Sequence, residues 1–156
     1  MTFVERLFEI LNSSQEKEEK PSVERNKVDA KFVGEAVNSY ISENAKNGNR
    51  LPMDGEYYTC SKEDIQKIVE EDQTNRNEYK EAEYDCENFA FSFMANAQKE
   101  YGVTTIGLVI DWSGGHAYNM FVYEDGTVEL YEPQSDTYPE PDSGDLYQFN
   151  RVRVII

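Results

Sequence analysis

Apolar residues at helical spacing predict three helices in the first two-thirds of the chain. One covers residues 28–41 and would end at the turn signal of residues 47–49. A second begins after Ser61, a candidate N-cap. The third is expected from about Asp85 to Lys99, with Gly102 as its C-terminal stop. The first part of the chain is therefore expected to be helical.

The pattern then changes to segments rich in β-branched and aromatic residues, bounded by Gly, Pro and Asp. These segments are predicted strands: 104–112, 116–123, 127–132 and 149–156. Helices followed by an antiparallel β-sheet indicate the α+β class. The proline-punctuated stretch 138–145 is expected to be an acidic loop between strands.

The first 26 residues differ from the rest. Apolar residues within 1–11 recur at helical spacing, which predicts a short amphipathic helix. This helix would either pack on the domain or dock on a partner. Residues 12–26 are almost free of apolar side chains and are typical of a charged linker. We therefore expect a helix and linker over 1–26 and one folded domain over 27–156.

Composition and charge exclude several classes of protein. The chain has 156 residues, with 31 Asp plus Glu against 15 Lys plus Arg, a formal net charge of −16. Such a balance argues against nucleic acid as a partner and against docking on anionic membranes. No segment is long and apolar enough for membrane insertion, and residues 1–11 are too charged for a secretory signal. With only two cysteines, the expected setting is cytoplasmic, with virion association as an alternative.

Cys86 and His116 are the candidate reactive pair. Cys86 falls where the third helix should begin, and a helix N-terminus lowers the pKa of a thiol. His116, the sole histidine, follows Gly114-Gly115 at the start of a predicted strand. Its imidazole would act as the base for a cysteine nucleophile. A third group, for which Glu132 is the candidate, should orient the ring.

The role of Glu132 depends on the register of a hairpin. A three-residue loop over 124–126, with its glycine in the left-handed conformation, would pair Tyr123 with Thr127. Because side chains alternate along a strand, Glu132 would then share the buried face with His116. A two-residue loop would place Glu132 on the opposite face.

Three segments together resemble a known family. Tyr84-Asp85-Cys86-Glu87-Asn88-Phe89-Ala90 resembles the Asp-Cys-acidic-polar-Phe-Ala element of papain-like and transglutaminase-like cysteine peptidases. Gly115-His116-Ala117-Tyr118-Asn119 and Tyr131-Glu132-Pro133-Gln134 resemble the later His and acidic segments, in the same order. The resemblance covers about residues 57–156. It is closest to the C-terminal, calcium-dependent protease domain of fungal agglutinins and its phage and prokaryotic relatives.

The resemblance implies a papain/transglutaminase-like fold and a cysteine hydrolase, or thiol protease, with a Cys-His-Glu triad. Its substrate would be a peptide or protein amide, with acyl transfer as a variant. Calcium dependence in the agglutinin relatives implies Ca²⁺ near Cys86, held by Asp85 and Glu87, whose oxygens suit this ion. Asp85 has the alternative role of an N-terminal helix charge.

The sequence also departs from the papain pattern. Residues 80–83 lack the oxyanion-hole glutamine, so the Cys86 backbone N–H would need a second, unidentified donor, for which Gln134 and Asn88 are candidates. Trp112 is expected either to wall the cleft or to pack in the core. The alternative function, from a different class, is a non-catalytic interaction or structural module of a virus or mobile element that retains the papain-like fold.

Overall fold

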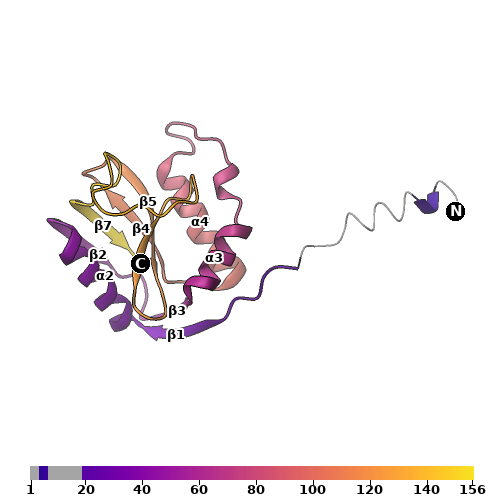
Figure 1. Ribbon diagram of the computed structural model, residues 1–156, viewed down its shortest axis with the longest axis horizontal. Coiled ribbons are helices and arrows are strands. Elements are labelled where there is room, and N and C mark those ends of the chain that lie inside the picture. Colours follow the sequence, from indigo (N-terminus) through magenta and orange to yellow (C-terminus); the bar gives the residue numbers. More distant parts are fainter. Residues whose placement is uncertain (1–3, 7–18) are drawn as a thin grey trace.

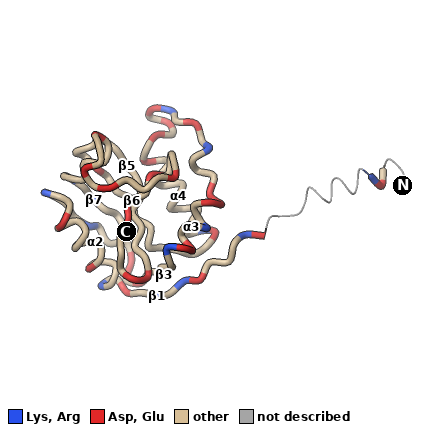
Figure 2. The backbone as a smooth tube through the Cα atoms, viewed as in Figure 1, with Lys and Arg blue, Asp and Glu red and all other residues tan. Residues whose placement is uncertain are grey.

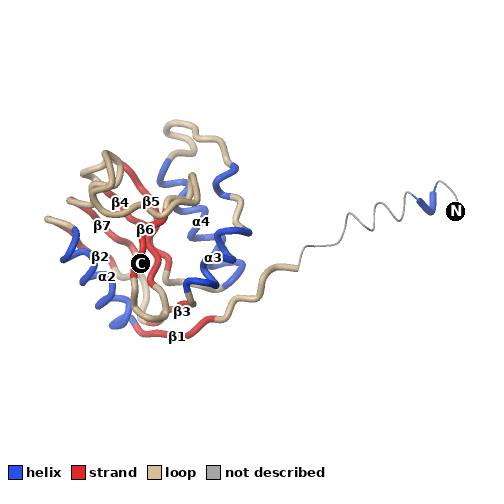
Figure 3. The backbone as a smooth tube through the Cα atoms, in the orientation of Figure 1, coloured by secondary structure: helices blue, strands red, loops and turns tan. Residues whose placement is uncertain are grey.

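The computed structural model describes residues 4–6 and 19–156. Of the predicted amphipathic helix over 1–11 only residues 4–6 are described, and these are helical; of the charged linker over 12–26, residues 12–18 lie outside the described residues. A five-stranded sheet is covered by α2 (Ala30–Asn44) on one face and by α4 (Cys86–Tyr101) on the other, as Figures 1 and 3 show. Within the described part of the chain, no helix has the length and apolar character needed to cross a membrane.

The sheet has the strand order β2-β7-β4-β5-β6, and β1 and β3 form a separate two-stranded ribbon. The remaining elements are β1 (Arg25–Asp29), β2 (Asn47–Leu51), β3 (Glu56–Cys60), α3 (Lys62–Glu71), η1 (Thr74–Arg76), β4 (Ile106–Asp111), β5 (His116–Val122), β6 (Val128–Tyr131) and β7 (Arg151–Ile155).

The three predicted helices are present, with ends set by local capping. The Ser61 hydroxyl accepts a hydrogen bond from the Asp64 amide at 3.1 Å, which confirms Ser61 as the N-cap of α3. Helix α4 ends at Gly102, whose φ of 67° is the left-handed conformation that glycine adopts without strain. The start of α3 and the end of α4 are each set by the chemistry of one residue, so they could be predicted from the sequence alone.

The predicted order of helices followed by a purely antiparallel sheet is wrong. Strands β1, β2 and β3 precede or separate the helices, and β2 runs parallel to β7. The stretch 47–49, expected as a turn, lies in β2. Gly48 instead allows β2 to lie close to α2 and β7, because a Cβ there would overlap Ile41 of α2 and crowd Val152 of β7. β1 also crosses the boundary expected between residues 26 and 27.

The predicted hairpin register is confirmed. β5 and β6 pair Val122 with Val128 and Asn119 with Tyr131, and Gly126 has a φ of 82° in the connecting loop. The alternation along β5 divides the core. Tyr118 and Met120 belong to the cluster under α2, whereas Phe121 packs with Phe93 of α4. A one-residue slip would exchange these faces.

Candidate functional site

A cleft of about 410 Å³ lies where the N-terminus of α4 meets the ends of β4 and β5. Its walls are largely apolar, and a few polar groups converge on it. The lining residues are Cys86, Glu87, Phe91, Leu108, Ile110, Asp111, Trp112, Gly115, His116, Ala117 and Ile155. The structure therefore brings Cys86 and His116, predicted from the sequence, into one depression with Trp112.

Cys86 is the first residue of α4 and is half-buried. Its Sγ donates a hydrogen bond to Oε2 of Glu87 at 3.3 Å. Burial raises the pKa of the thiol; the backbone N–H of Ala117 lowers it, and the hydrogen bond and charge of Glu87 raise it again. The net pKa is above the ordinary value, so the lowered pKa expected from the helix terminus is wrong for this geometry.

His116 and Glu132 form a buried pair. Nε2 of His116 lies 2.6 Å from Oε2 of Glu132, and the two side chains are 8% and 4% exposed. The Tyr147 hydroxyl donates to the same Oε2 at 2.9 Å, and the Gln134 amide donates to Oε1 at 3.0 Å. Burial raises the pKa of Glu132, but the hydrogen bonds and charge of His116, with those two donors, outweigh it and hold the pKa below its usual range.

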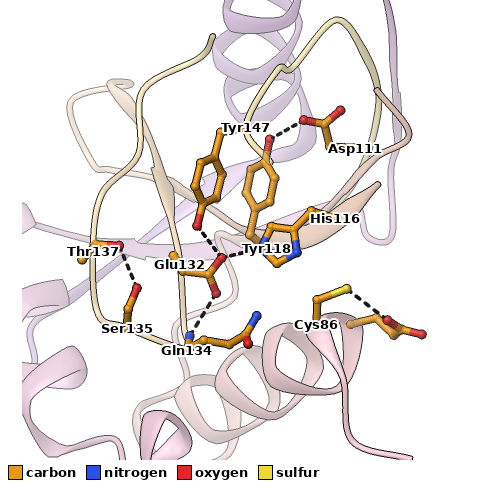
Figure 4. Close-up of polar contacts among 10 residues, drawn as sticks. Cys86, Asp111, His116, Tyr118, Glu132, Gln134, Ser135, Thr137 and Tyr147 are labelled. Atoms are coloured by element: carbon orange, nitrogen blue, oxygen red, sulfur yellow. Dashed lines mark hydrogen bonds and ion pairs between the residues drawn. The ribbon is translucent and has the colours of Figure 1, made fainter. Parts of the chain in front are cut away.

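Figure 4 shows Cys86 on α4 near the second ring nitrogen of His116, the one not used by Glu132. No hydrogen bond joins Cys86 to His116 among the described residues. Chemically, this nitrogen can accept the thiol proton, and the Glu132 carboxylate can stabilise the resulting imidazolium. The site thus places an imidazole between a thiol and a carboxylate in space.

The candidate oxyanion donors are used in other ways. The Asn88 side chain accepts a hydrogen bond from the Asp85 amide at 3.1 Å and so caps α4. The backbone amide of Gln134 is committed to Glu132, while its side chain extends toward the side of Cys86 in Figure 4. Trp112 is 46% exposed and lines the cleft, so the core-packing alternative for this residue is wrong.

Asp85 and Glu87 flank Cys86, and one ligand atom from each of the three residues lies within 4.8 Å of the others. Oδ1 of Asp85 is buried without a hydrogen-bond partner. Hydrogen bonding to Glu87, burial and the charge of Glu87 raise the pKa of Asp85, as expected for two carboxyl groups sharing a proton. Their oxygens fit Ca²⁺, which takes hard oxygen ligands, whereas the Cys86 sulfur does not.

Sequence reasoning missed Tyr147 and Asp111. Tyr147 comes from the 133–150 connection, and its ring packs edge-on against His116 with centroids 5.6 Å apart. Asp111 is buried and accepts hydrogen bonds from the Tyr118 hydroxyl at 3.1 Å and the Phe149 amide at 2.8 Å. It thereby ties the segment after Tyr147 to the sheet. The only feature of the sequence that could have pointed to Asp111 is an acidic residue at the end of a predicted buried strand. No sequence feature pointed to Tyr147.

Comparisons with known proteins give a family and a fold. The model of the ricin-type beta-trefoil lectin C-terminal domain matches residues 32–147. A solved structure described as a PSL1a-E64 complex is 20% identical, with a TM-score of 0.65, covering 83% of this chain and 51% of that chain. No curated protein sequence matches the chain.

A second solved structure is the Polyporus squamosus lectin bound to the human-type influenza-binding epitope Neu5Acα2-6Galβ1-4GlcNAc. It is also 20% identical, with a TM-score of 0.62 and coverage of 83% of this chain and 49% of that one. The chain thus spans about half the length of the two structures. At this identity the similarity shows the fold alone.

These findings correct the assignment drawn from the sequence. The family found is a lectin C-terminal domain in place of papain/transglutaminase-like cysteine peptidases, and the expected fold class is corrected with it. The cysteine hydrolase function, the thiol-protease class and the peptide substrate rested on that resemblance and are withdrawn; the non-catalytic module gains no specific support. The matched residues 32–147 include most of the described elements and the whole Cys86, His116 and Glu132 cluster. The chain belongs to the ricin-type beta-trefoil lectin C-terminal domain family.

Proposed function

We propose that this domain is the C-terminal module of a lectin-type protein and that it binds a carbohydrate-bearing ligand in the cleft beside Cys86. The observation that carries the proposal is Trp112, a large aromatic side chain left 46% exposed on the wall of that cleft. Small-ligand sites combine apolar and aromatic walls with a few convergent polar groups, as this cleft does. The face of a sugar ring carries C–H groups that pack on an indole, and its hydroxyls need polar partners.

The polar groups of the cleft suit a hydroxyl-rich ligand. Glu87 is an exposed acceptor at one wall, and the second ring nitrogen of His116 faces the same space. A glycan that carries no charge or a single carboxylate meets little long-range repulsion from the net charge of −16, because distant charges are screened at physiological salt. The Polyporus squamosus lectin, similar in fold at 20% identity, was solved with a glycan epitope, which adds support for this class of ligand.

We further propose specific roles for the residues of the cluster. Cys86 is the thiol that faces the ligand, the second ring nitrogen of His116 is the acceptor within reach for its proton, and Glu132 holds the ring in place. Support comes from the 2.6 Å contact between His116 and Glu132 and from the shared cleft of Cys86 and His116. Burial, together with the hydrogen bond and charge of Glu87, raises the pKa of the Cys86 thiol above its ordinary value, so the neutral thiol is favoured at neutral pH.

Calorimetric titration of the protein with Neu5Acα2-6Galβ1-4GlcNAc tests the binding function. We expect saturable binding that Trp112→Ala weakens by about tenfold or more, the order expected for loss of an aromatic anchor. The matched control is Tyr58→Ala, which removes another exposed aromatic side chain, on β3 outside the cleft. Equal weakening by both variants, or no binding by the wild type, would refute the proposed cleft.

A further inference from the structure

Donor atoms of three chemical kinds converge at the polar end of the cleft. One ligand atom each from Asp85, Cys86 and Glu87 lies within 4.8 Å of the other two, and Sγ of Cys86 is 3.3 Å from Oε2 of Glu87. Cys86, Glu87 and His116 all line the cleft. The same space is therefore offered a thiol sulfur, a carboxylate oxygen and an imidazole nitrogen.

His116 is held in the way that metal-binding histidines are held. Its Nε2 lies 2.6 Å from the Glu132 carboxylate, and its side chain is 8% exposed. Because the pKa of Glu132 is lowered and its carboxylate is ionised, Nε2 carries the proton and Nδ1 has a free lone pair. Nδ1 makes no hydrogen bond with the described residues and faces Cys86 in Figure 4. A metal-ligating histidine typically donates its other ring N–H to a carboxylate in this way.

Glu87 is better placed than Asp85 to supply the oxygen. Oδ2 of Asp85 accepts a hydrogen bond from the Ala82 amide at 3.2 Å, which ties this carboxylate to the turn before α4. Glu87 is exposed, and its carboxylate already contacts the sulfur. Zinc bonds of about 2.3 Å to sulfur and about 2.0 Å to oxygen, at a tetrahedral angle, separate the two ligand atoms by about 3.5 Å. The 3.3 Å between Sγ of Cys86 and Oε2 of Glu87 is close to that spacing.

We propose that Cys86, Glu87 and His116 bind a Zn²⁺ ion through Sγ, a carboxylate oxygen and Nδ1, with the fourth tetrahedral position open to the cleft. Zinc sites with three protein ligands keep that position for water or a bound ligand. The thiol proton passes to solvent as the sulfur bonds the metal. The zinc site does not depend on the proposed glycan binding.

The donor set and the charge of the protein select this kind of ion. Sulfur and nitrogen donors suit Zn²⁺, whereas Ca²⁺ and Mg²⁺ take oxygen ligands and would use only Glu87 of the three. The net charge is −16, and Asp and Glu residues recur along most of the described chain, as Figure 2 shows, so a divalent cation is attracted to the protein. A bound Zn²⁺ also compensates the negative charges of Glu87 and the Cys86 thiolate, which otherwise repel each other.

Cobalt identifies the sulfur ligand, because a Co²⁺–thiolate bond gives a charge-transfer absorption band that oxygen and nitrogen ligands do not give. The reduced, metal-free protein is titrated with Co²⁺ in an absorption spectrometer and with Zn²⁺ in a calorimeter. The variants are Cys86→Ser and Glu87→Gln. The matched controls are Cys60→Ala, which removes the other thiol, and Glu83→Gln, which removes a nearby exposed acid. Thermal melting verifies folding, and iodoacetamide labelling of wild-type Cys86 with and without Zn²⁺ needs no variant.

We expect the wild type to bind one Zn²⁺ per chain and to be protected by it from alkylation at Cys86. The Co²⁺–thiolate band should appear in the wild type and both controls and be absent from Cys86→Ser. Glu87→Gln should weaken Zn²⁺ binding about tenfold or more, and Glu132→Gln, which alters the support of the His116 ring, about tenfold to a hundredfold with the band retained.

Several results would overturn the zinc site. They are a wild type that binds no Zn²⁺, a Co²⁺–thiolate band that persists in Cys86→Ser, and a labelling rate of Cys86 that saturating Zn²⁺ leaves unchanged. Equal Zn²⁺ affinity of Glu132→Gln and wild type would remove His116 from the ligand set and overturn the site as proposed. None of these results bears on glycan binding, which the titration with the trisaccharide measures separately.

Discussion

Nε2 of His116 lies 2.6 Å from Oε2 of Glu132, and almost all of both side chains is removed from solvent. A buried carboxylate persists in ionised form only when hydrogen bonds and an opposite charge compensate for its lost hydration. Here the Gln134 amide and the Tyr147 hydroxyl complete that compensation. The pair therefore fixes one ring nitrogen of His116 and leaves the other facing the cleft.

Removing the carboxylate should destabilise the fold. Glu132→Ala leaves the Tyr147 hydroxyl and the His116 ring without their buried acceptor, at a cost of about 3 kcal/mol in the free energy of unfolding. Denaturant unfolding measures it, with Glu43→Ala on the exposed face of α2 as the control, expected within about 0.5 kcal/mol of wild type. A Glu132→Ala protein as stable as the Glu43→Ala control would show that the His116–Glu132 pair contributes nothing to the free energy of unfolding.

The same carboxylate predicts a pH dependence. The pKa of Glu132 is lower in the folded protein than its ordinary value of 4.5, so the unfolded chain binds the proton more readily. Its contribution to stability is therefore fully present above 4.5 and is lost as the pH falls through the lower, folded pKa. Unfolding free energies measured from neutral to acid pH should fall less steeply for Glu132→Gln than for wild type. Parallel curves for the two proteins would contradict this assignment.

Iodoacetamide should distinguish the two thiols. Cys60 is fully buried and burial raises its pKa to about 12, so only Cys86 should be labelled in the native protein. Burial raises the pKa of Cys86 most and Glu87 raises it further, so Glu87→Gln should increase the labelling rate at neutral pH several-fold. Peptide mapping gives both rates, with Glu83→Gln as the nearby control. A labelling rate of Cys86 unaffected by Glu87→Gln would show that the Glu87 carboxylate does not raise the pKa of this thiol.

Calcium should act through Asp85 and Glu87. A bound Ca²⁺ would neutralise both carboxylates, lower the pKa of Cys86, speed its alkylation and raise the melting temperature by stabilising only the folded state. Asp85→Asn keeps a good helix cap and should abolish both effects. If calcium and chelator give the same alkylation rate and the same melting temperature, these residues do not form a calcium site.

Gly114 should be essential to the segment that carries Tyr147. A Cβ on Gly114 would overlap the backbone carbonyl of Leu146. The backbone just after it is anchored, because the Phe149 amide donates to Asp111 and the Asn150 amide donates to the Ser113 hydroxyl. Gly114→Ala should therefore cost about 1–3 kcal/mol of stability, as other overpacked sites do. Gly55→Ala, where a Cβ meets nothing within 4 Å, is the matched control in the same denaturant experiment. Equal stability of the two variants would mean that the segment adjusts without cost.

The sequence allowed prediction of features that depend on local pattern. Ser61 and Gly102 set helix ends through their own chemistry, and the loop ending in Gly126 set the register that brings Glu132 to His116. Strand β2 could not be found in this way. Its partner β7 is about a hundred residues distant, as in the pairing of Asn47 with Arg151, and its glycine resembles a turn.

Other parts of the site depend on three-dimensional surroundings. Tyr147 belongs to an irregular connection without periodicity, so no pattern pointed to its contact with Glu132. The pKa of Cys86 was expected to be low from the helix terminus alone, but burial and the neighbouring Glu87 decide its direction. The family assignment was also wrong, because short motifs around a cysteine and a histidine can occur outside the family they resemble.

The central claim, a glycan bound in the cleft beside Cys86, is tested most directly by protection of that thiol. Iodoacetamide labelling of Cys86 is followed by peptide mapping while Neu5Acα2-6Galβ1-4GlcNAc is increased to saturation. The account predicts that the labelling rate of Cys86 falls along the same saturation curve as the change in fluorescence of Trp112, the single tryptophan of the chain. A rate that stays constant at every concentration of the glycan would contradict it.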